Sequence, residues 1–442
     1  MASASRAAAR ARLRGDIRRS VLPGDLRVTT ENLPHSQTFN VGIFAGVGSR
    51  HESPALHGAA HFLEHVLFKG TRRRSPEEIA QAIESVGGDI NAYTAKEHTC
   101  FYARVLAEDA ALAVDVLSDM VTESVVAAHE VEAERAVILE EIAMHADDPG
   151  EVVQELACGQ LFGATGLGVP VIGSEQSIRA LSRAQILSYW RRHYTPANLV
   201  VVATGQVDHD ELLLQLAALD GHRVSAHPPR RRSQPAAASE PAVLAATRRL
   251  EQCTATLTFV SPGLFDPRRY PLALLSIIVG GGMASRLFVE VRERRGLTYG
   301  IDAGETAYSD AGVWSVDWQC SPDKLPQILS LVSAGLAEVA RDGVTEDELA
   351  RAKGQVRGQT VLSLEGPSAR MFRLGVNELL GDSRTVDELL RHYDAVTADE
   401  IRREAATLFA GPPVLAVVGP RVARKSLSTI LEDWPGRQVS PR

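Results

Sequence analysis

Two histidines and a glutamate stand close together in the segment GAAHFLEHVLFKG, residues 58–70. His61 and His65 are four residues apart, and Glu64 directly precedes the second histidine. On a helix, residues at positions i and i+4 share a face, so both imidazoles can point at one atom. Imidazole nitrogen is a common metal ligand, and a neighbouring carboxylate can accept a proton from water. The segment therefore predicts either a metal site or a cluster of hydrogen-bonded polar side chains on a helix.

The residues around this motif favour the metal site. A helix that is apolar on nearly every side is buried, and buried histidines and glutamates need partners that a metal ion can supply. A catalytic zinc site uses three protein ligands and keeps one position open, so two histidines predict a third ligand elsewhere in the chain. The apolar residues of the segment are Ala59, Ala60, Phe62, Leu63, Val66, Leu67 and Phe68.

The third ligand is expected on the segment ERAVILEEIAMHADDP, residues 134–149. Glu134 and Glu141 are seven residues apart, so they lie on one face of a helix. Glu140 points about 100° away from Glu141 and is expected to be solvated. The alternative for the first two acids is that they lie on an exposed helix face and bind nothing.

The overall composition limits the class of protein. With 442 residues the chain is long enough for two or more domains, and 45% hydrophobic with 23% charged residues is typical of a soluble globular protein. A formal net charge of −8 argues against nucleic acid as a partner. The four cysteines are far apart and form no C-x-x-C pair, which argues against a disulfide framework. Because no apolar run reaches about 18 residues, we expect no membrane span.

The N-terminus is rich in arginine. Residues 1–19 contain six arginines and one acid, Asp16, as in a mitochondrial transit peptide. Only five of the 47 basic residues in the whole chain are lysines, so arginine is the usual cation of this protein everywhere. We therefore expect residues 1–22 to be a disordered tail of a bacterial cytoplasmic protein, with the mitochondrial matrix as the alternative location.

A segment rich in Pro, Ala, Ser and Arg, residues 222–247, is expected to be a linker between two domains, 23–221 and 248–442. The two halves repeat one order of elements. In the first half we expect strands at 38–52 and 87–106 and helices at 75–87, 107–121 and 129–146. In the second half we expect strands at 255–263 and 296–320 and helices at 270–282, 321–343 and 344–366.

The grouping of strands and helices predicts an α+β fold made of two duplicated domains, each with a mainly antiparallel sheet packed against helices. The segment 270–282 is the counterpart of the motif helix and contains no His or Glu. The polar motif therefore belongs to one copy of a repeated scaffold, as expected for a functional site added to it.

The HFLEH motif followed by ERAVILEEI resembles the M16 (pitrilysin/insulinase) metallopeptidases, whose inverted zinc motif is H-x-x-E-H. The resemblance is greatest to short two-domain members such as the mitochondrial processing peptidase β subunit and its bacterial relatives, and it covers roughly residues 24–420. In this family the third zinc ligand lies 76 residues after the second motif histidine, which is Glu141 here. The supporting acid lies seven residues earlier and matches Glu134.

The resemblance implies that His61, His65 and Glu141 bind one zinc ion per chain, that Glu64 is the general base, and that Glu134 orients a ligand histidine. It implies a zinc-dependent endopeptidase that acts on short or unfolded polypeptides. Two alternatives remain open. The chain could be a catalytic-type subunit that needs a paralogous partner, or a binding subunit that keeps zinc without turnover.

The resemblance also implies substrate-binding residues. Asn91 and Ala92 match the family's edge strand, where main-chain groups pair with the peptide. The alternative for Asn91 is a turn residue following a Gly-Gly pair. Arg292 and Tyr299 match a family pair seven residues apart; Arg292 would anchor a substrate carbonyl, and Tyr299 would stabilise the tetrahedral oxyanion.

The family pattern finally implies two domains that face one another around a cavity. Because family members often work as pairs, we expect a homodimer or a heterodimer with a paralogous subunit, with a self-sufficient monomer as the alternative. The glycine-rich run at 280–282 lacks G-K-[ST] and does not follow an expected strand, so nucleotide binding is not expected there.

Overall fold

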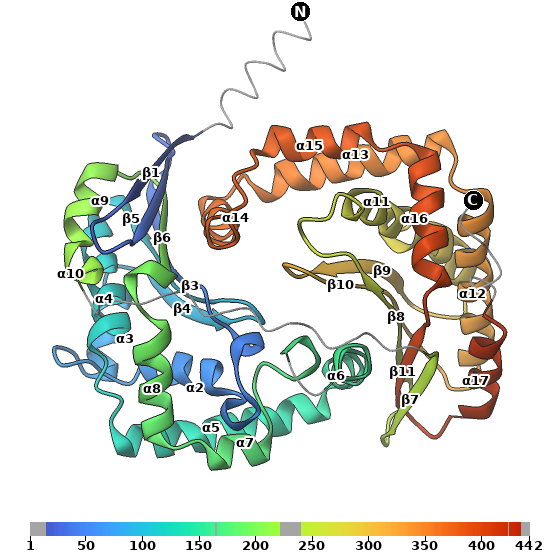
Figure 1. The fold of residues 1–442 in the computed structure, drawn as a ribbon, viewed down its shortest axis with the longest axis horizontal. Helices are drawn as coiled ribbons and strands as arrows, with labels where there is room; N and C mark the ends of the chain where they lie inside the picture. The colour runs from blue at the N-terminus through green and yellow to red at the C-terminus, as the bar shows by residue number, and fades with distance from the viewer. Residues whose placement is uncertain (1–14, 164–165, 222–239, 423, 435–442) are drawn as a thin grey trace, which may run out of the picture. The chain divides into compact units, whose positions relative to one another are not determined.

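The chain forms two compact units, each with one β-sheet and several helices (Figure 1). Unit 1 takes its residues from Met1–Ile142, Pro170–Ser233 and Val361–Ser383. Unit 2 takes its residues from Ala143–Val169, Gln234–Thr360 and Arg384–Arg442. The computed structural model describes residues 15–163, 166–221, 240–422 and 424–434.

Unit 1 contains a six-stranded sheet with the order β1-β2-β6-β3-β5-β4. Strands β2 and β6 are parallel and all other neighbours are antiparallel, so the sheet is mainly antiparallel, as the sequence predicted. Strand β4 lies at one edge of the sheet and pairs with β5. The strands are β1 (Asp16–Val21), β2 (Arg27–Asn32), β3 (Thr38–Ala45), β4 (Asp89–Thr94), β5 (Thr99–Leu106) and β6 (Leu199–Gly205).

The helices of unit 1 cover both faces of this sheet. Helix α5 continues beyond the boundary of the unit and ends at Asp147. The helices are α2 (Ala59–Leu67), α3 (Pro76–Glu84), α4 (Ala110–Glu123), α5 (Ala128–Asp147), α7 (Glu175–Ala180), α8 (Arg183–His193), α9 (His209–Gln215), α10 (Ala217–Asp220) and α14 (Pro367–Leu380).

The two faces of strand β3 show how the sheet is buried. Side chains alternate along a strand, so Phe39, Val41 and Ile43 share one face and join the main core with helix α2. Phe44 points to the other face and packs against Met371 of α14. The sheet therefore lies between α14 on one side and helix α2, which carries the HFLEH motif, on the other (Figure 1).

Unit 2 contains a five-stranded sheet with the order β7-β11-β8-β10-β9, in which β7 and β11 are parallel. This order matches β2-β6-β3-β5-β4 of unit 1, which confirms the duplication that the sequence predicted. The strands are β7 (Ala242–Thr247), β8 (Cys253–Ser261), β9 (Ile301–Ala307), β10 (Gly312–Cys320) and β11 (Val414–Gly419). The helices are α6 (Pro149–Phe162), α11 (Arg269–Gly280), α12 (Leu325–Asp342), α13 (Glu346–Ser363), α15 (Val386–Ala395), α16 (Ala398–Ala410) and α17 (Arg424–Glu432).

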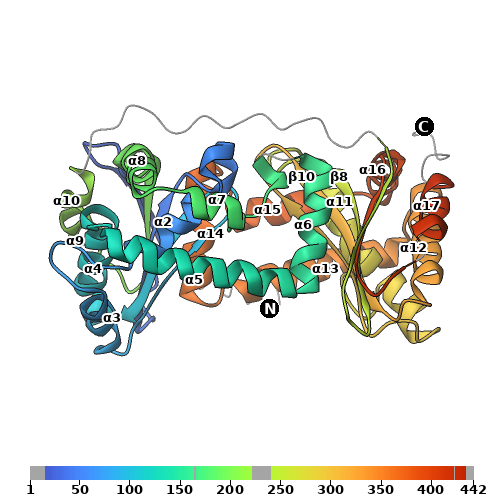
Figure 2. The same cartoon turned by 90° about the horizontal axis from the view of Figure 1, so that it is seen from below.

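One helix from each half of the chain packs in the unit formed mainly by the other half. Helix α6 follows α5 in the first half (Figure 2), yet its Val153 and Ala157 pack against Ala416 and Val418 of β11. Helix α14 follows α13 in the second half and packs on the sheet of unit 1. The compact units therefore differ from the expected domains 23–221 and 248–442 by the exchange of these two helices.

Two expected irregular segments contain strands instead. Residues 16–21 of the expected disordered tail form β1, which pairs with β2. This strand is held further by an Arg18–Asp210 ion pair of 2.8 Å and by a 2.8 Å hydrogen bond between Ser20 Oγ and His209 Nε2. The end of the expected linker forms β7, because its backbone pairs in parallel with β11. Residues 1–14 of the tail and 222–239 of the linker lie outside the described residues.

Two further sequence expectations can be compared with the structure. The four cysteines are free thiols, in agreement with the expected lack of a disulfide framework. Within the described residues, the helices are too short or too polar to cross a membrane.

Candidate metal centre

Helix α2 begins at a buried carboxylate. Its first turn is preceded by Gly58, which has a φ of 86° and no side chain that could cap the helix. The cap comes from Glu52, whose carboxylate accepts hydrogen bonds from the backbone N–H groups of Gly58 at 2.8 Å and Ala60 at 2.7 Å. Burial raises the pKa of the Glu52 carboxyl to about 8, although the backbone donors act in the opposite direction. The start of the motif helix is thus fixed by a group within the protein interior.

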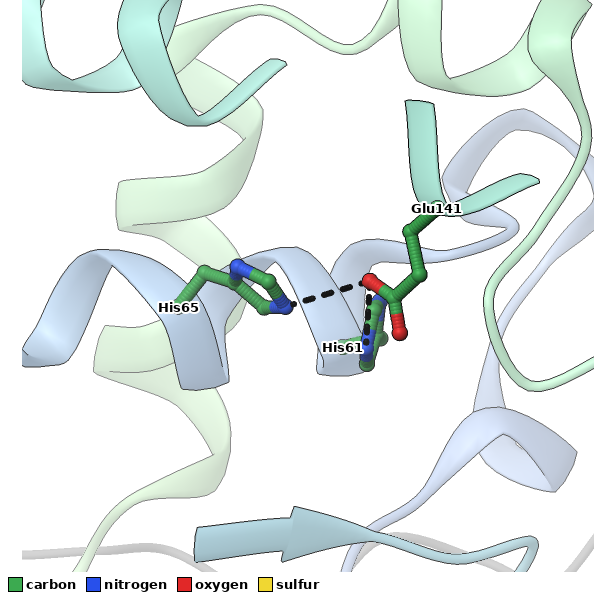
Figure 3. A group of neighbouring side chains, drawn as sticks. All are labelled: His61, His65 and Glu141. Carbon is green, nitrogen blue, oxygen red and sulfur yellow. Dashed lines mark ion pairs between the residues drawn. The ribbon is translucent and has the colours of Figure 1, made fainter. Parts of the chain in front are cut away.

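The motif helix is buried on most sides, as the sequence predicted, with side chains Phe62, Leu63, Val66 and Leu67 in the core. The two histidines lie on its remaining face, where the His61 side chain is 12% exposed and the His65 side chain 21% exposed. They point toward Glu141 of helix α5 (Figure 3).

His61, His65 and Glu141 bring three possible ligand atoms together. Glu141 Oε2 lies 3.7 Å from His61 Nε2 and 3.6 Å from His65 Nε2. One ligand atom from each residue lies within 4.8 Å of the others. Ligand atoms about 2 Å from a tetrahedral zinc ion are about 3.3 Å apart, so the two measured separations are close to this value. Two imidazole nitrogens and one carboxylate oxygen also suit zinc chemically.

A second carboxylate orients His65. Glu134 Oε2 lies 2.9 Å from His65 Nδ1, and its other oxygen, Oε1, lies 2.7 Å from Lys69 Nζ. With the proton on Nδ1 donated to Glu134, the lone pair of Nε2 points toward Glu141, as a metal ligand requires. Lys69 was not predicted as a site residue from the sequence, although it lies four residues after His65.

Glu64 lies on the same helix and is largely buried. Burial raises the pKa of its carboxyl, and Glu141 raises it further, whereas a hydrogen bond from Thr94 and the charge of His65 lower it. Thr94 Oγ1 donates to Glu64 Oε2 at 2.5 Å. A carboxylate with a raised pKa is a stronger base than an ordinary one. Thr94 was also absent from the candidates that the sequence suggested.

Two models of known protein families match this chain. The model of the family described as "Insulinase (Peptidase family M16)" matches residues 27–175, and that of "Peptidase M16 inactive domain" matches residues 180–356. The chain belongs to the M16 peptidase family. The first matched region contains the two histidines and Glu141, and the second contains Arg292 and Tyr299.

Relatives of this M16 chain span nearly its whole length. A protein named as an uncharacterized zinc protease in Streptomyces coelicolor is 43% identical over 413 residues, covering 92% of this chain and 90% of the relative. One with the same description in Mycobacterium tuberculosis is 44% identical over 423 residues, covering 95% and 97%. A third, from Bacillus subtilis, is 34% identical over 405 residues, covering 91% and 98%.

Solved structures share the fold of this M16 chain. A crystal structure titled as a peptidase M16 inactive domain from Pseudomonas fluorescens has a TM-score of 0.86 at 20% identity, covering 92% of this chain and 98% of the other. A protease from Helicobacter pylori has a TM-score of 0.86 at 18% identity, covering 92% and 100%. At these identities the likeness concerns the fold alone.

The expected substrate-binding residues of this M16 chain lie in both units. Asn91 and Ala92 are on the edge strand β4, where Asn91 is exposed and its Oδ1 accepts a 2.8 Å hydrogen bond from the Ala92 N–H. Asn91 is therefore a strand residue and not part of a turn. Arg292 and Tyr299 lie in unit 2, with the guanidinium 5.2 Å from the centre of the tyrosine ring. Tyr299 is 88% exposed. The structure thus brings Arg292 and Tyr299 together with each other, in a different unit from the histidines and Glu141.

Proposed function

We propose that this chain is a zinc-dependent endopeptidase that hydrolyses short or unfolded polypeptides. The observation that carries the proposal is the convergence of His61, His65 and Glu141, with the partly buried carboxylate of Glu64 on the helix of the two histidines. Membership of the M16 family and the zinc proteases among its relatives support the same chemistry. His61, His65 and Glu141 would hold one zinc ion per chain.

Each residue of the site has a separate role in the proposed hydrolysis. When bound, zinc would supply a Lewis acid that polarises the water and the scissile carbonyl. Glu64 accepts a proton from the attacking water and delivers it to the nitrogen of the leaving amine. Glu134, held by Lys69, keeps the His65 ring in the orientation and tautomer needed for metal binding.

Strand β4 is the proposed docking edge for the peptide. Main-chain groups around Asn91 and Ala92 would pair with an extended substrate, which gives affinity with little dependence on sequence. Because only an extended segment can add to a sheet edge, this mode of binding favours short or unfolded polypeptides over folded domains.

The test is an assay of the purified full-length chain against a mixture of unfolded peptides, with a folded protein as control. We expect the peptides to be cleaved and the folded protein to remain intact. Removal of zinc by a chelator should abolish cleavage, and one equivalent of zinc per chain should restore it. A sizing column run in parallel would show whether the active species is the proposed dimer.

The outcomes separate this proposal from its alternatives. A chain that binds one zinc ion and cleaves only after a paralogous subunit is added would be the catalytic member of a pair. A chain that binds zinc and cleaves no peptide under either condition would be a binding subunit, and the peptidase proposal would fail.

Arg292 and Tyr299 are proposed to contact the substrate and the developing oxyanion. We expect Arg292→Ala and Tyr299→Phe each to lower kcat/KM by about 100-fold, the scale found when one oxyanion donor is removed. Zinc content should stay unchanged, since neither residue is a ligand. Arg294→Ala is the control, because Arg294 forms a 3.0 Å ion pair with Glu290 on the surface and should be neutral. Loss of zinc in either variant would make the pair structural instead.

A further inference from the structure

Strand β4 carries a polar side chain that reaches the general base. Thr94 is the last residue of β4, three residues after Asn91, and its Oγ1 donates a 2.5 Å hydrogen bond to Glu64 Oε2. Asn91 and Thr94 are an odd number of residues apart, so their side chains point to opposite faces of the strand. The strand proposed to bind substrate thus also contacts the base on helix α2.

The turn after Thr94 is held in place by a neighbouring segment. The N–H of Ser49 donates to the carbonyl of Ala95 at 3.3 Å, and the N–H of Arg50 donates to the carbonyl of Lys96 at 2.8 Å. The Arg50 guanidinium is fully buried and forms a 2.6 Å ion pair with Glu97. Breaking a buried ion pair is costly, so this contact gives the turn a defined position.

The same segment holds the start of helix α2. Arg50 lies two positions before Glu52, whose carboxylate caps that helix through the N–H groups of Gly58 and Ala60. The preceding Gly48 approaches the turn so closely that a Cβ there would lie 2.2 Å from the carbonyl oxygen of Ala95. Residues 48–52 therefore connect the end of β4 to the beginning of α2 by short contacts on both sides.

We propose that Thr94 is a positioning residue for catalysis, an inference that rests on the proposed peptidase function. Its hydroxyl donates to Oε2 of the Glu64 carboxylate and thereby fixes the rotation of that carboxylate about its side chain. Because residues 48–52 fix the end of β4 against the start of α2, the hydroxyl remains in a constant place relative to the base. Strand β4 thereby serves both to bind the peptide and to orient the group that activates water.

The test compares two substitutions that differ by a hydroxyl group. Thr94→Val keeps the shape of the side chain and removes the donor, and it should lower kcat about 10- to 100-fold, because hydrogen bonds to charged groups are among the stronger ones. KM and zinc content should change less than about two-fold. Thr94→Ser keeps the donor and should recover most of kcat. Thr99→Val is the matched control, since Thr99 pairs with Thr94 across the strands but donates to the carbonyl of Val47.

A binding measurement without turnover completes the test. In the Glu64→Gln background, the dissociation constant for an uncleaved peptide should be the same with or without the Thr94→Val substitution, because Thr94 acts on the base and not on the peptide. Weaker peptide binding, loss of zinc, an unchanged kcat in Thr94→Val, or equal damage in Thr94→Ser would each overturn the positioning role. If the wild type binds zinc and cleaves no peptide, the proposed peptidase function is wrong, and so is the positioning role of Thr94. If the wild type is active and one of these contrary results is found, only the positioning role of Thr94 is wrong, and the proposed peptidase function stands.

Discussion

Replacement of Glu64 by glutamine is expected to abolish peptide hydrolysis while zinc remains bound. Glutamine has nearly the same shape and its amide oxygen can still accept the hydrogen bond from Thr94, but the neutral amide cannot take a proton from water. A positioned general base contributes roughly 10²- to 10⁴-fold to a rate, so kcat should fall by at least about 100-fold. Zinc should stay close to one equivalent, because the clustered ligand atoms come from His61, His65 and Glu141. Metal analysis and initial rates on the same preparation measure both quantities.

The control for this substitution is a carboxylate that is not part of the proposed site. Glu84→Gln on helix α3 removes the same charge from an exposed position and should change neither rate nor zinc content. A Glu64→Gln enzyme that keeps more than about a tenth of its activity would show that another group is the base. Loss of zinc in that variant would make Glu64 part of the ligand set.

The parts of the site that depend on helix geometry could be predicted from sequence. His61 and His65 share a face because they are four residues apart, and Glu134 and Glu141 share one because they are seven apart. The same geometry predicted that Glu140 points away, and this residue is exposed in the structure. Periodicity within one helix is a local property, so no knowledge of the packing is needed to see it.

Of the residues that support the site, Glu134 was predicted, whereas Thr94, Glu52 and Lys69 were not. Thr94 reaches Glu64 from a strand, and Glu52 caps helix α2 from a short loop. Lys69 could have been predicted more easily, because it lies four residues after His65 on the sequence and both side chains contact the carboxylate of Glu134. Such partners become visible only when the order of strands and the position of each turn are known.

The fold shows the same division between local and long-range information. The strands and helices of each half follow from patterns of apolar residues, and the repetition of those patterns predicted two similar sheets. Helices α6 and α14 follow corresponding helices in the two halves, and each packs an apolar face on a sheet. An apolar face predicts that a helix is packed, but its periodicity does not say which sheet it covers. Strands β1 and β7 were missed because one is rich in charge and the other in alanine, and pairing with a neighbour decides their structure.

The ligand assignment on helix α5 leads to a second prediction with a large effect. Glu141→Gln should weaken zinc affinity by at least about 100-fold, because substitution of supporting residues alone typically costs 10- to 100-fold and a direct ligand contributes more. The two histidines would remain, but the negative charge that neutralises part of the metal charge would be lost. Competition with a chromophoric chelator gives the zinc dissociation constant without any need for catalysis.

Glu140→Gln is the matched control for Glu141→Gln, since it makes the same chemical change one residue away on the same helix. Its side chain is exposed, whereas Glu141 Oε2 lies within 3.7 Å of both histidine Nε2 atoms. We therefore expect the zinc affinity of Glu140→Gln to equal that of the wild type. Equal losses in the two variants would mean that the charge of the helix as a whole, and not one oriented carboxylate, attracts the metal. A loss confined to Glu140→Gln would show that the register of α5 against α2 is wrong.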